Sequence, residues 1–328
     1  MKNNFIGKCL LIGVIITIGM LCTNRADAKV IKIKSNNISE YTKDRCIAIY
    51  DVKNNSTTIY DNEEIEKIVK KEKASRFRIS FKEPKHKLET IVGSNINRRT
   101  FQYSGNGVLP TIIGNDDRML VDNIYRNEFP ICATAAISVR HQNGSYSGGT
   151  AFNVGPRLTA TAGHILIDRS GSFPDDTMVE FGLINGTANY TYHERDIQSY
   201  IWVGGATGEF NSDNDYGFIV WNNDISEYVG HYGVEYNYNI GDACATYGYP
   251  VDSMFNDSMI FELGTITSKY NRTLELNLDS NEGQSGSPIY VNGGYAIGIL
   301  HGGNGYSTFA RQLDSDLTDW LDAYGYFD

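Results

Sequence analysis

The chain has 328 residues, with 39 Asp and Glu against 29 Lys and Arg, and a net charge of −10 when histidine is neutral. The charge is unevenly distributed. Residues 29–110 hold 17 basic and 10 acidic side chains, net +7, whereas residues 111–328 hold 9 basic and 28 acidic ones, net −19. So acidic a segment argues against nucleic acid as a partner.

The chain begins with the pattern of a secretory signal peptide. Lys2 and Lys8 form a basic start before an apolar run over residues 9–22, and Ala-Asp-Ala at 26–28 fits the small-residue cleavage rule. We therefore expect a signal peptide over residues 1–28 and a secreted, extracellular protein with no membrane attachment after cleavage. A membrane anchor is the alternative, but the run is shorter than the ~20 residues of a spanning helix.

Residues 29–110 are interpreted as a prosegment, held partly by charge against the acidic domain that follows. A basic tail is the alternative interpretation. Short strands are expected at 47–50 and 56–60, and a solvated helix at 63–73 with Ile65, Ile68 and Val69 on one side. Arg98-Arg99 is a candidate processing site, and residues 103–107 have the composition of a flexible linker.

From residue 111 the sequence is typical of β structure, with β-branched and aromatic runs between Gly, Asn, Asp and Pro. Strands are expected at 133–139, 218–221, 243–249, 259–266, 273–278 and 296–300, with a hairpin over 149–162. Many short strands of this kind predict an all-β sandwich or barrel. Near the end, Leu317, Trp320, Leu321 and Tyr324 share one face of a helix, and Gly325 is placed to stop it.

The chain has five cysteines, and Cys9 and Cys22 lie in the signal peptide. Cys46 lies in the basic segment, while Cys132 and Cys244 are the only two in the acidic domain. In an oxidising compartment those two could pair, and the sequence leaves a disulfide and free thiols equally open. No Cys/His cluster has metal-ligand spacing, so neither a metal nor a cofactor is expected.

Three motifs follow one another in a fixed order. They are Thr-Ala-Gly-His at 161–164, Asn-Asp-Tyr-Gly at 214–217 and Gly-Gln-Ser-Gly-Ser-Pro at 283–288. A serine nucleophile needs a base, an acid that orients the base, and donors for the oxyanion. His, Asp and Ser in this order are typical of chymotrypsin-like proteases. Glycines around Ser285 expose backbone N–H groups, and we assign the oxyanion donors to Gly283 and Ser285.

Residues 111–328 resemble the glutamyl endopeptidase family of secreted bacterial serine proteases. The resemblance rests on Ile-Ile-Gly-Asn-Asp-Asp-Arg at 112–118, Thr-Ala-Thr-Ala-Gly-His at 159–164, the aspartate motif at 214–217, and Asp279-Ser280 with the serine motif. It implies a chymotrypsin-like double β-barrel, with barrels at approximately 111–225 and 226–312 and a C-terminal helix at 314–324. The resemblance does not extend to the sequence of residues 29–110. It implies only that a prosegment precedes the protease domain, as in the family.

The resemblance implies a role for each catalytic residue. Ser285 would be the nucleophile, His164 the general base and then acid, and Asp215 the group that orients the imidazole. Two rivals stay open: Asp213, two residues before Asp215, and Ser287, which lacks flanking glycines and would brace the turn.

The resemblance also implies cleavage after glutamate, with aspartate weaker. His301 would meet the substrate carboxylate by a charge-assisted hydrogen bond, and Ser280 would add a hydroxyl donor. The freed amino terminus near Ile112 would add positive charge, while Gly302 and Gly303 would let the substrate backbone approach.

Two observations oppose cleavage after glutamate. Asp279 lies six residues before Ser285, where trypsin-like enzymes carry the aspartate that selects Arg or Lys. In addition, this chain has one more residue between Gly298 and His301 than some relatives, and a one-residue step along a strand reverses the face of a side chain.

The sequence thus predicts a secreted serine endopeptidase, made as a zymogen cut near Thr111 or Ile112. It would act on polypeptides as a monomer, with its own prosegment as a partner. Alternatives are cleavage after Arg or Lys, a protease with few targets, and an inactive secreted binding protein on the protease fold.

Overall fold

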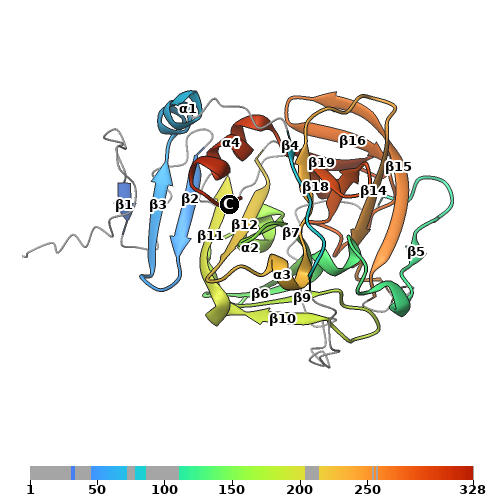
Figure 1. Cartoon of the computed structure of the whole chain (residues 1–328), viewed down its shortest axis with the longest axis horizontal. Coiled ribbons are helices and arrows are strands. Elements are labelled where there is room, and N and C mark those ends of the chain that lie inside the picture. The colour runs from blue at the N-terminus through green and yellow to red at the C-terminus, as the bar shows by residue number, and fades with distance from the viewer. Residues whose placement is uncertain are drawn as a thin grey trace, which may run out of the picture.

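The computed structural model describes residues 31–33, 46–71, 78–85, 111–203, 214–252, 255 and 258–327. The regular structure of these residues is mainly β-strand, and the strands form two sheets with short helices around them (Figure 1). Four expectations from the sequence lie outside the described residues: the signal peptide, the Arg98-Arg99 pair, the linker at 103–107 and the rival acid Asp213.

The first sheet has ten strands in the order β1-β3-β2-β11-β12-β8-β7-β6-β9-β10, with every neighbouring pair antiparallel. Its strands are β1 (Ile31–Ile33), β2 (Ile47–Asp51), β3 (Ser56–Tyr60), β6 (Thr134–His141), β7 (Tyr146–Gly155), β8 (Leu158–Thr161), β9 (Pro174–Phe181), β10 (Tyr190–His193), β11 (Ile197–Val203) and β12 (Tyr216–Trp221).

The second sheet has nine strands, in the order β17-β14-β15-β16-β19-β18-β13-β4, with β5 paired to β15 and β17 also paired to β18. Its strands are β4 (Arg78–Ile79), β5 (Met119–Leu120), β13 (Gly233–Glu235), β14 (Ala243–Gly248), β15 (Ile260–Tyr270), β16 (Thr273–Asn277), β17 (Pro288–Val291), β18 (Tyr295–Gly303) and β19 (Thr308–Gln312). The predicted all-β class with two barrel-like sheets is therefore confirmed.

The helices are short. They are α1 (Asn62–Lys71), α2 (Gly163–Leu166), α3 (Ser226–Val229), α4 (Ser315–Ala323) and the 3₁₀ turns η2 (Asn123–Tyr125), η3 (Ile131–Ala133) and η4 (Glu194–Asp196). α4 confirms the predicted C-terminal helix, and the Asp314 side chain caps it by accepting from the N–H of Leu317.

Strand β12 shows how the core is built. Phe218 and Val220 pack in one apolar cluster with Trp320 of α4, while Ile219 and Trp221 pack in a second cluster inside the first sheet. Successive side chains of a strand point to opposite faces, so an uninterrupted apolar run is buried on both sides. This two-sided packing fixes the strand that begins at the aspartate motif.

The described part of residues 29–110 is integrated into the two sheets. β2 pairs with β11 along five residues (Figure 1), and β4 pairs with β13. Tyr60 packs edge-on against Trp320 and Tyr324, and Ile65 of α1 is 3% exposed. Strand pairing and apolar packing therefore hold this segment. The predicted helix is present as α1, with Glu63, Glu66 and Lys67 exposed and Ile65 buried.

Charge contributes at the margin of that contact. The ammonium groups of Lys82 and Lys85 lie 3.2 Å and 2.7 Å from the Glu227 carboxylate. Exposed pairs of this kind contribute little, typically about 0–1 kcal/mol. The predicted opposition of charges is present in these pairs, but it is secondary to the packing.

The three cysteines in the described residues, Cys46, Cys132 and Cys244, are all buried, and Cys132 and Cys244 are free thiols. Burial raises the pKa of Cys244 to about 12 and that of Cys46 to about 11. Cys132 and Cys244 do not pair, so the disulfide alternative is excluded. None of the described helices has the length and apolar character needed to cross a membrane.

Candidate active site

His164 and Asp215 meet because their strands are neighbours. β8 leads directly into the one-turn helix α2, which carries His164, and Asp215 immediately precedes β12. In the sheet, Thr161 of β8 pairs with Gly217 of β12. A Cβ at Gly217 would come within 2.9 Å of Leu166 and 3.1 Å of the Ala162 carbonyl, so glycine is needed for the helical turn to rest on the strand.

The Asp215 carboxylate holds His164 at two points. One oxygen accepts the His164 backbone N–H at 2.9 Å, and the other lies 2.7 Å from Nδ1 of the imidazole. An ionised carboxylate only accepts hydrogen bonds, so Nδ1 carries the proton and Nε2 is left to act as the base. Asp215 is 4% exposed, which keeps water away from this contact.

The charges of the pair support each other. Burial opposes ionisation of Asp215, but the charge and hydrogen bonds of His164 outweigh it and lower the pKa of the carboxyl. For His164, burial acts to lower the pKa, yet the Asp215 charge prevails and raises it above its ordinary value. The site therefore favours an imidazolium that forms during a reaction.

The serine motif is a tight turn that needs its glycines. Gly283 and Gly286 have φ of +90° and +89°, in the left-handed region. A Cβ on Gly286 would lie 1.9 Å from the Thr150 carbonyl oxygen and 2.5 Å from the Thr161 hydroxyl. The turn thus lies against β7 and the end of β8, three residues before His164.

Backbone donors in this turn fall into two groups. The N–H groups of Gln284, Gly286 and Ser287 donate to the carbonyls of Asn281, Leu300 and Gln284. Within the described residues, the N–H groups of Gly283 and Ser285 donate to no protein acceptor. The carbonyls of these same residues are held by the Thr150 hydroxyl and N–H, at 2.9 Å and 2.8 Å. The geometry leaves two fixed donors for a ligand oxygen beside Ser285.

Ser287 is in a different environment from Ser285. Ser285 is partly exposed, whereas Ser287 is fully buried, and a Cβ on Gly248 would lie 2.4 Å from its hydroxyl oxygen. The Ser287 backbone spans the turn, with its N–H on Gln284 and its carbonyl accepting from Leu300. This agrees with a bracing role for Ser287.

The residues expected to contact the substrate side chain lie around the start of the acidic domain. Thr111 pairs with Ser280 through two backbone hydrogen bonds of 2.8 Å and 2.7 Å. The Ser280 hydroxyl lies 2.8 Å from that of Thr308, and Gly303 lies so close to Thr111 that a Cβ would meet its hydroxyl at 2.0 Å. Both oxygens of Asp279 are engaged by backbone N–H groups.

His301 occupies a bulge in β18. Leu300 pairs with Ala310 and Gly302 pairs with Phe309. Ala310 and Phe309 are consecutive in β19, so His301 is an extra residue of β18 with no partner in the ladder. Its Nε2 accepts a hydrogen bond from Nη2 of Arg311 at 2.7 Å. Burial and the charge of Arg311 lower the pKa of His301 to about 3. His301 is thus neutral at ordinary pH. A neutral ring can still donate an N–H to a substrate carboxylate, and the ionised acceptor makes that hydrogen bond charge-assisted.

Comparison with known proteins identifies the family. The family model described as Trypsin matches residues 122–315. The chain belongs to the trypsin family. It is 29% identical, over 231 residues, to a glutamyl endopeptidase of Bacillus licheniformis, covering 65% of this chain and 69% of the relative. Membership and this relative together make the chain a serine endopeptidase.

Solved structures agree on the trypsin-family fold. A structure titled Glu endopeptidase in complex with MPD aligns with a TM-score of 0.57 at 21% identity, over 66% of this chain and all of the other. The protease Anisep from Arthrobacter nicotinovorans aligns with a TM-score of 0.51 at 22% identity, over 60% of this chain and 98% of the other. The aligned fraction of this chain, 66% and 60%, is close to the fraction that lies after residue 110.

Sequence reasoning missed one residue of this trypsin-family site. Arg311 is fully buried and donates to the Thr273 hydroxyl as well as to His301. The available signal was an arginine inside an otherwise uncharged strand, Thr-Phe-Ala-Arg-Gln at 308–312. A buried guanidinium in such a strand must be hydrogen-bonded.

Proposed function

We propose that this chain is a secreted endopeptidase that cleaves after glutamate through Ser285, His164 and Asp215, and that it is made as a zymogen. The observation that carries the catalytic part is the two-point contact between Asp215 and His164, beside a serine turn with two uncommitted N–H groups.

The chemistry follows from these positions. Neutral His164 takes the Ser285 proton at Nε2 as the hydroxyl oxygen attacks the substrate carbonyl. The N–H groups of Gly283 and Ser285 stabilise the oxyanion, each contributing typically about 2.7–4 kcal/mol. Asp215 stabilises the imidazolium, which then protonates the leaving amine. Water then takes the place of the leaving amine. His164 removes a proton from the water as it attacks the acyl-enzyme, and the imidazolium returns that proton to the Ser285 oxygen as the acid product leaves.

The preference for glutamate is supported by the groups around Asp279. Both Asp279 oxygens accept backbone N–H groups from Ile113 and Asp117, at 2.7 Å and 3.2 Å. A carboxylate held in this way is poorly suited to bind an incoming Arg or Lys side chain. This favours glutamate over the Arg/Lys alternative.

His301 supplies the donor in this proposal. Because its Nε2 accepts from Arg311, the neutral ring carries its proton on Nδ1, which is left to donate to a substrate carboxylate. Arg311 polarises the ring from behind and adds the positive charge that His301 lacks. The bulge at His301 accommodates the extra residue relative to some relatives.

Processing near Thr111 would add a second positive charge. The Thr111 N–H lies 2.8 Å from the Ser280 carbonyl, so a new amino terminus here would be an ammonium beside Ser280. The uncut chain lacks this charge, which gives a physical reason for a weakly active zymogen. Amino-terminal sequencing of active secreted protein tests this; a fully active form starting at Lys29 would contradict it.

Matched peptides with Glu, Asp, Arg or Phe before the scissile bond test the specificity of the processed protein. We expect the highest kcat/KM for Glu. His301→Leu should reduce the Glu preference, while His193→Leu, the same change on β10, should keep it. A higher kcat/KM for Arg than for Glu overturns the proposed specificity, and an unchanged ratio in His301→Leu removes His301 from it.

A further inference from the structure

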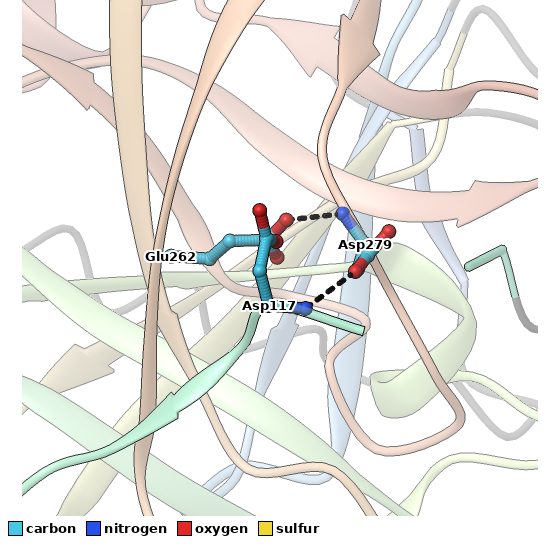
Figure 2. Close-up of side chains that lie close together, drawn as sticks. All are labelled: Asp117, Glu262 and Asp279. Carbon is cyan, nitrogen blue, oxygen red and sulfur yellow. Dashed lines mark hydrogen bonds between the residues drawn. The ribbon is translucent and has the colours of Figure 1, made fainter. Parts of the chain in front are cut away.

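Three carboxylates from distant parts of the chain converge on the second sheet. Asp117 comes from the loop before β5, Glu262 from β15 and Asp279 from the segment after β16 (Figure 2). One oxygen from each lies within 4.8 Å of the others. Two oxygens bound to one Ca²⁺ at about 2.4 Å each are at most about 4.8 Å apart, so the three can share an ion.

An acidic cluster alone does not make a site, but Glu262 adds an independent observation. Its side chain is 3% exposed, and its Oε1 accepts the Asp279 N–H. The other oxygen, Oε2, is buried and has no hydrogen-bond partner among the described residues. A buried carboxylate oxygen without a partner is costly unless a proton or a cation compensates it.

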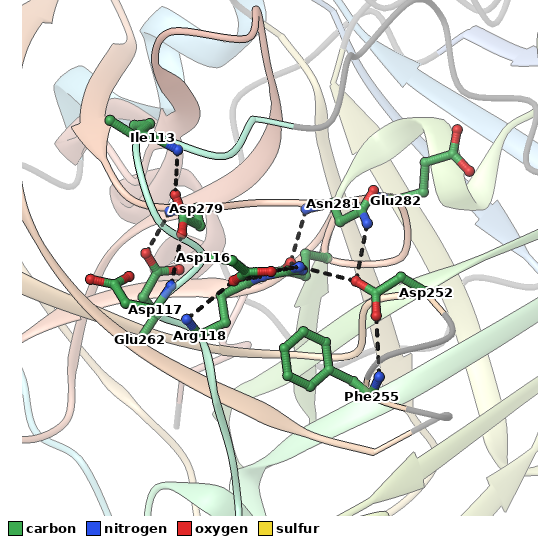
Figure 3. Close-up of polar contacts among 11 residues, drawn as sticks. Ile113, Asp116, Asp117, Arg118, Asp252, Phe255, Glu262, Asp279, Asn281 and Glu282 are labelled. Carbon is green, nitrogen blue, oxygen red and sulfur yellow. Dashed lines mark hydrogen bonds and ion pairs between the residues drawn. The ribbon is translucent and has the colours of Figure 1, made fainter.

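The negative charge of the three carboxylates is not balanced by the side chains around them. Arg118 is the nearby cation, but its guanidinium contacts Asp116 at 2.7 Å, Asp252 at 3.1 Å and the Gln284 amide oxygen at 3.0 Å (Figure 3). It therefore faces two further carboxylates before it can offset the three of the cluster.

We propose that Asp117, Glu262 and Asp279 form a calcium site that fastens residues 113–118 to the second sheet. Asp279 already holds the N–H groups of Ile113 and Asp117, so the ion would close a contact that exists in part. Asp117 is exposed, which leaves room for water to complete the coordination. This inference does not depend on which peptide bond the enzyme cleaves.

Calcium fits better than magnesium because the donors cannot rearrange freely. Asp279 has both oxygens on backbone N–H groups, and Glu262 has one. Mg²⁺ needs a nearly ideal octahedron at 2.0–2.1 Å, whereas Ca²⁺ tolerates irregular sets of about 6–8 oxygens. Cysteine and histidine spacing gave no sign of this site because its ligands are carboxylates far apart in the sequence.

Calorimetry and thermal unfolding of the full chain test the site, with Ser285→Ala as the parent to prevent self-cleavage. We expect one Ca²⁺ per chain after chelator treatment. At about 100 times the dissociation constant, the melting temperature should rise by roughly 5–10 °C. Asp117→Asn should weaken binding at least about tenfold, because one of three charged ligands is lost.

Two further variants complete the test. Glu262→Gln should abolish the calcium-dependent shift, whereas Glu180→Gln, a buried strand glutamate in the other sheet, should keep it. Asp117 is exposed, so Asp117→Asn remains informative if Glu262→Gln does not fold. The proposal is overturned if the parent shows no saturable binding up to about 10 mM, or if both variants keep the parental shift. An equal response to Mg²⁺ would overturn the assignment to calcium.

Discussion

Replacing Asp215 by Asn removes the negative charge beside His164, the proposed general base, with almost no change in shape. In the native site, one Asp215 oxygen accepts the His164 backbone N–H and the other accepts Nδ1–H. Asparagine has only one oxygen. If that oxygen keeps the backbone N–H, the amide group faces Nδ1 and donates to it, so the ring proton moves to Nε2.

A proton on Nε2 disables the base, because that nitrogen must receive the Ser285 proton. We expect kcat to fall by about 10⁴, as in other Ser-His-Asp enzymes with this substitution. That corresponds to about 5.5 kcal/mol of barrier height. KM should change little, since Asp215 has no contact with the substrate in this mechanism. The loss of the Asp215 charge should also lower the pKa of His164, which Asp215 raises in the native site.

The assay is steady-state hydrolysis of a glutamyl peptide across pH, with kcat and KM determined separately. Asp224→Asn is a suitable control, because Asp224 contacts Ser226 and Lys82 and lies outside the site. The variant should show a lower acid midpoint than the parent as well as a lower kcat. A loss of less than about tenfold, with thermal stability preserved, would refute the assigned role of Asp215.

Three other predictions follow from the same geometry. Because only neutral His164 accepts a proton and its pKa is raised above 6.5, activity should rise with pH with a midpoint above 6.5; a profile flat from mildly acid to alkaline pH would count against this. Gly283→Ala should lower kcat by roughly 10²–10³, since its φ is +90° and a Cβ would meet the Tyr249 carbonyl at 2.3 Å; Gly241→Ala is the matched control, with φ of +93° but open space, and equal kcat losses in both would argue against a role in the oxyanion hole. After cleavage near Thr111, the segment containing β2 and β3 should stay bound, because β2 pairs with β11 and Tyr60 packs on α4; gel filtration followed by denaturing electrophoresis should show two chains in one peak, and separate peaks would contradict this.

Local patterns in the sequence were enough to predict most of the framework. Short apolar runs bounded by turn residues gave β6, β7, β8, β12, β14, β15, β16 and β18 within a few residues. The repeat of Leu317, Trp320 and Leu321 gave α4. Such patterns are readable because strand and helix periodicities depend on neighbouring residues alone. The strands that these patterns did not predict are β1, β4, β5, β9, β10, β11, β13, β17 and β19.

The proposed catalytic residues were predicted from motif order, while their contacts depend on strand pairing. His164 and Asp215 are 51 residues apart, and only the adjacency of β8 and β12 brings them within 2.7 Å. The same holds for the bulge at His301. An extra residue in a strand either turns the following side chains to the opposite face of the sheet or is absorbed in a β-bulge. Pairing with the neighbouring strand decides which of the two occurs.

What the sequence determined by itself is therefore what is local: strands, a terminal helix, the turn around Ser285 and the family to which its motifs belong. What only the tertiary structure decided is the partnership of groups distant in the chain. Arg311 behind His301, the N-terminal strands on β11, and Glu262 beside Asp117 and Asp279 belong to this second class. The physical reason is that a buried charge or an exposed strand edge finds its partner when the chain packs. Packing brings together segments that are far apart in the sequence, and no local pattern indicates which segments these will be.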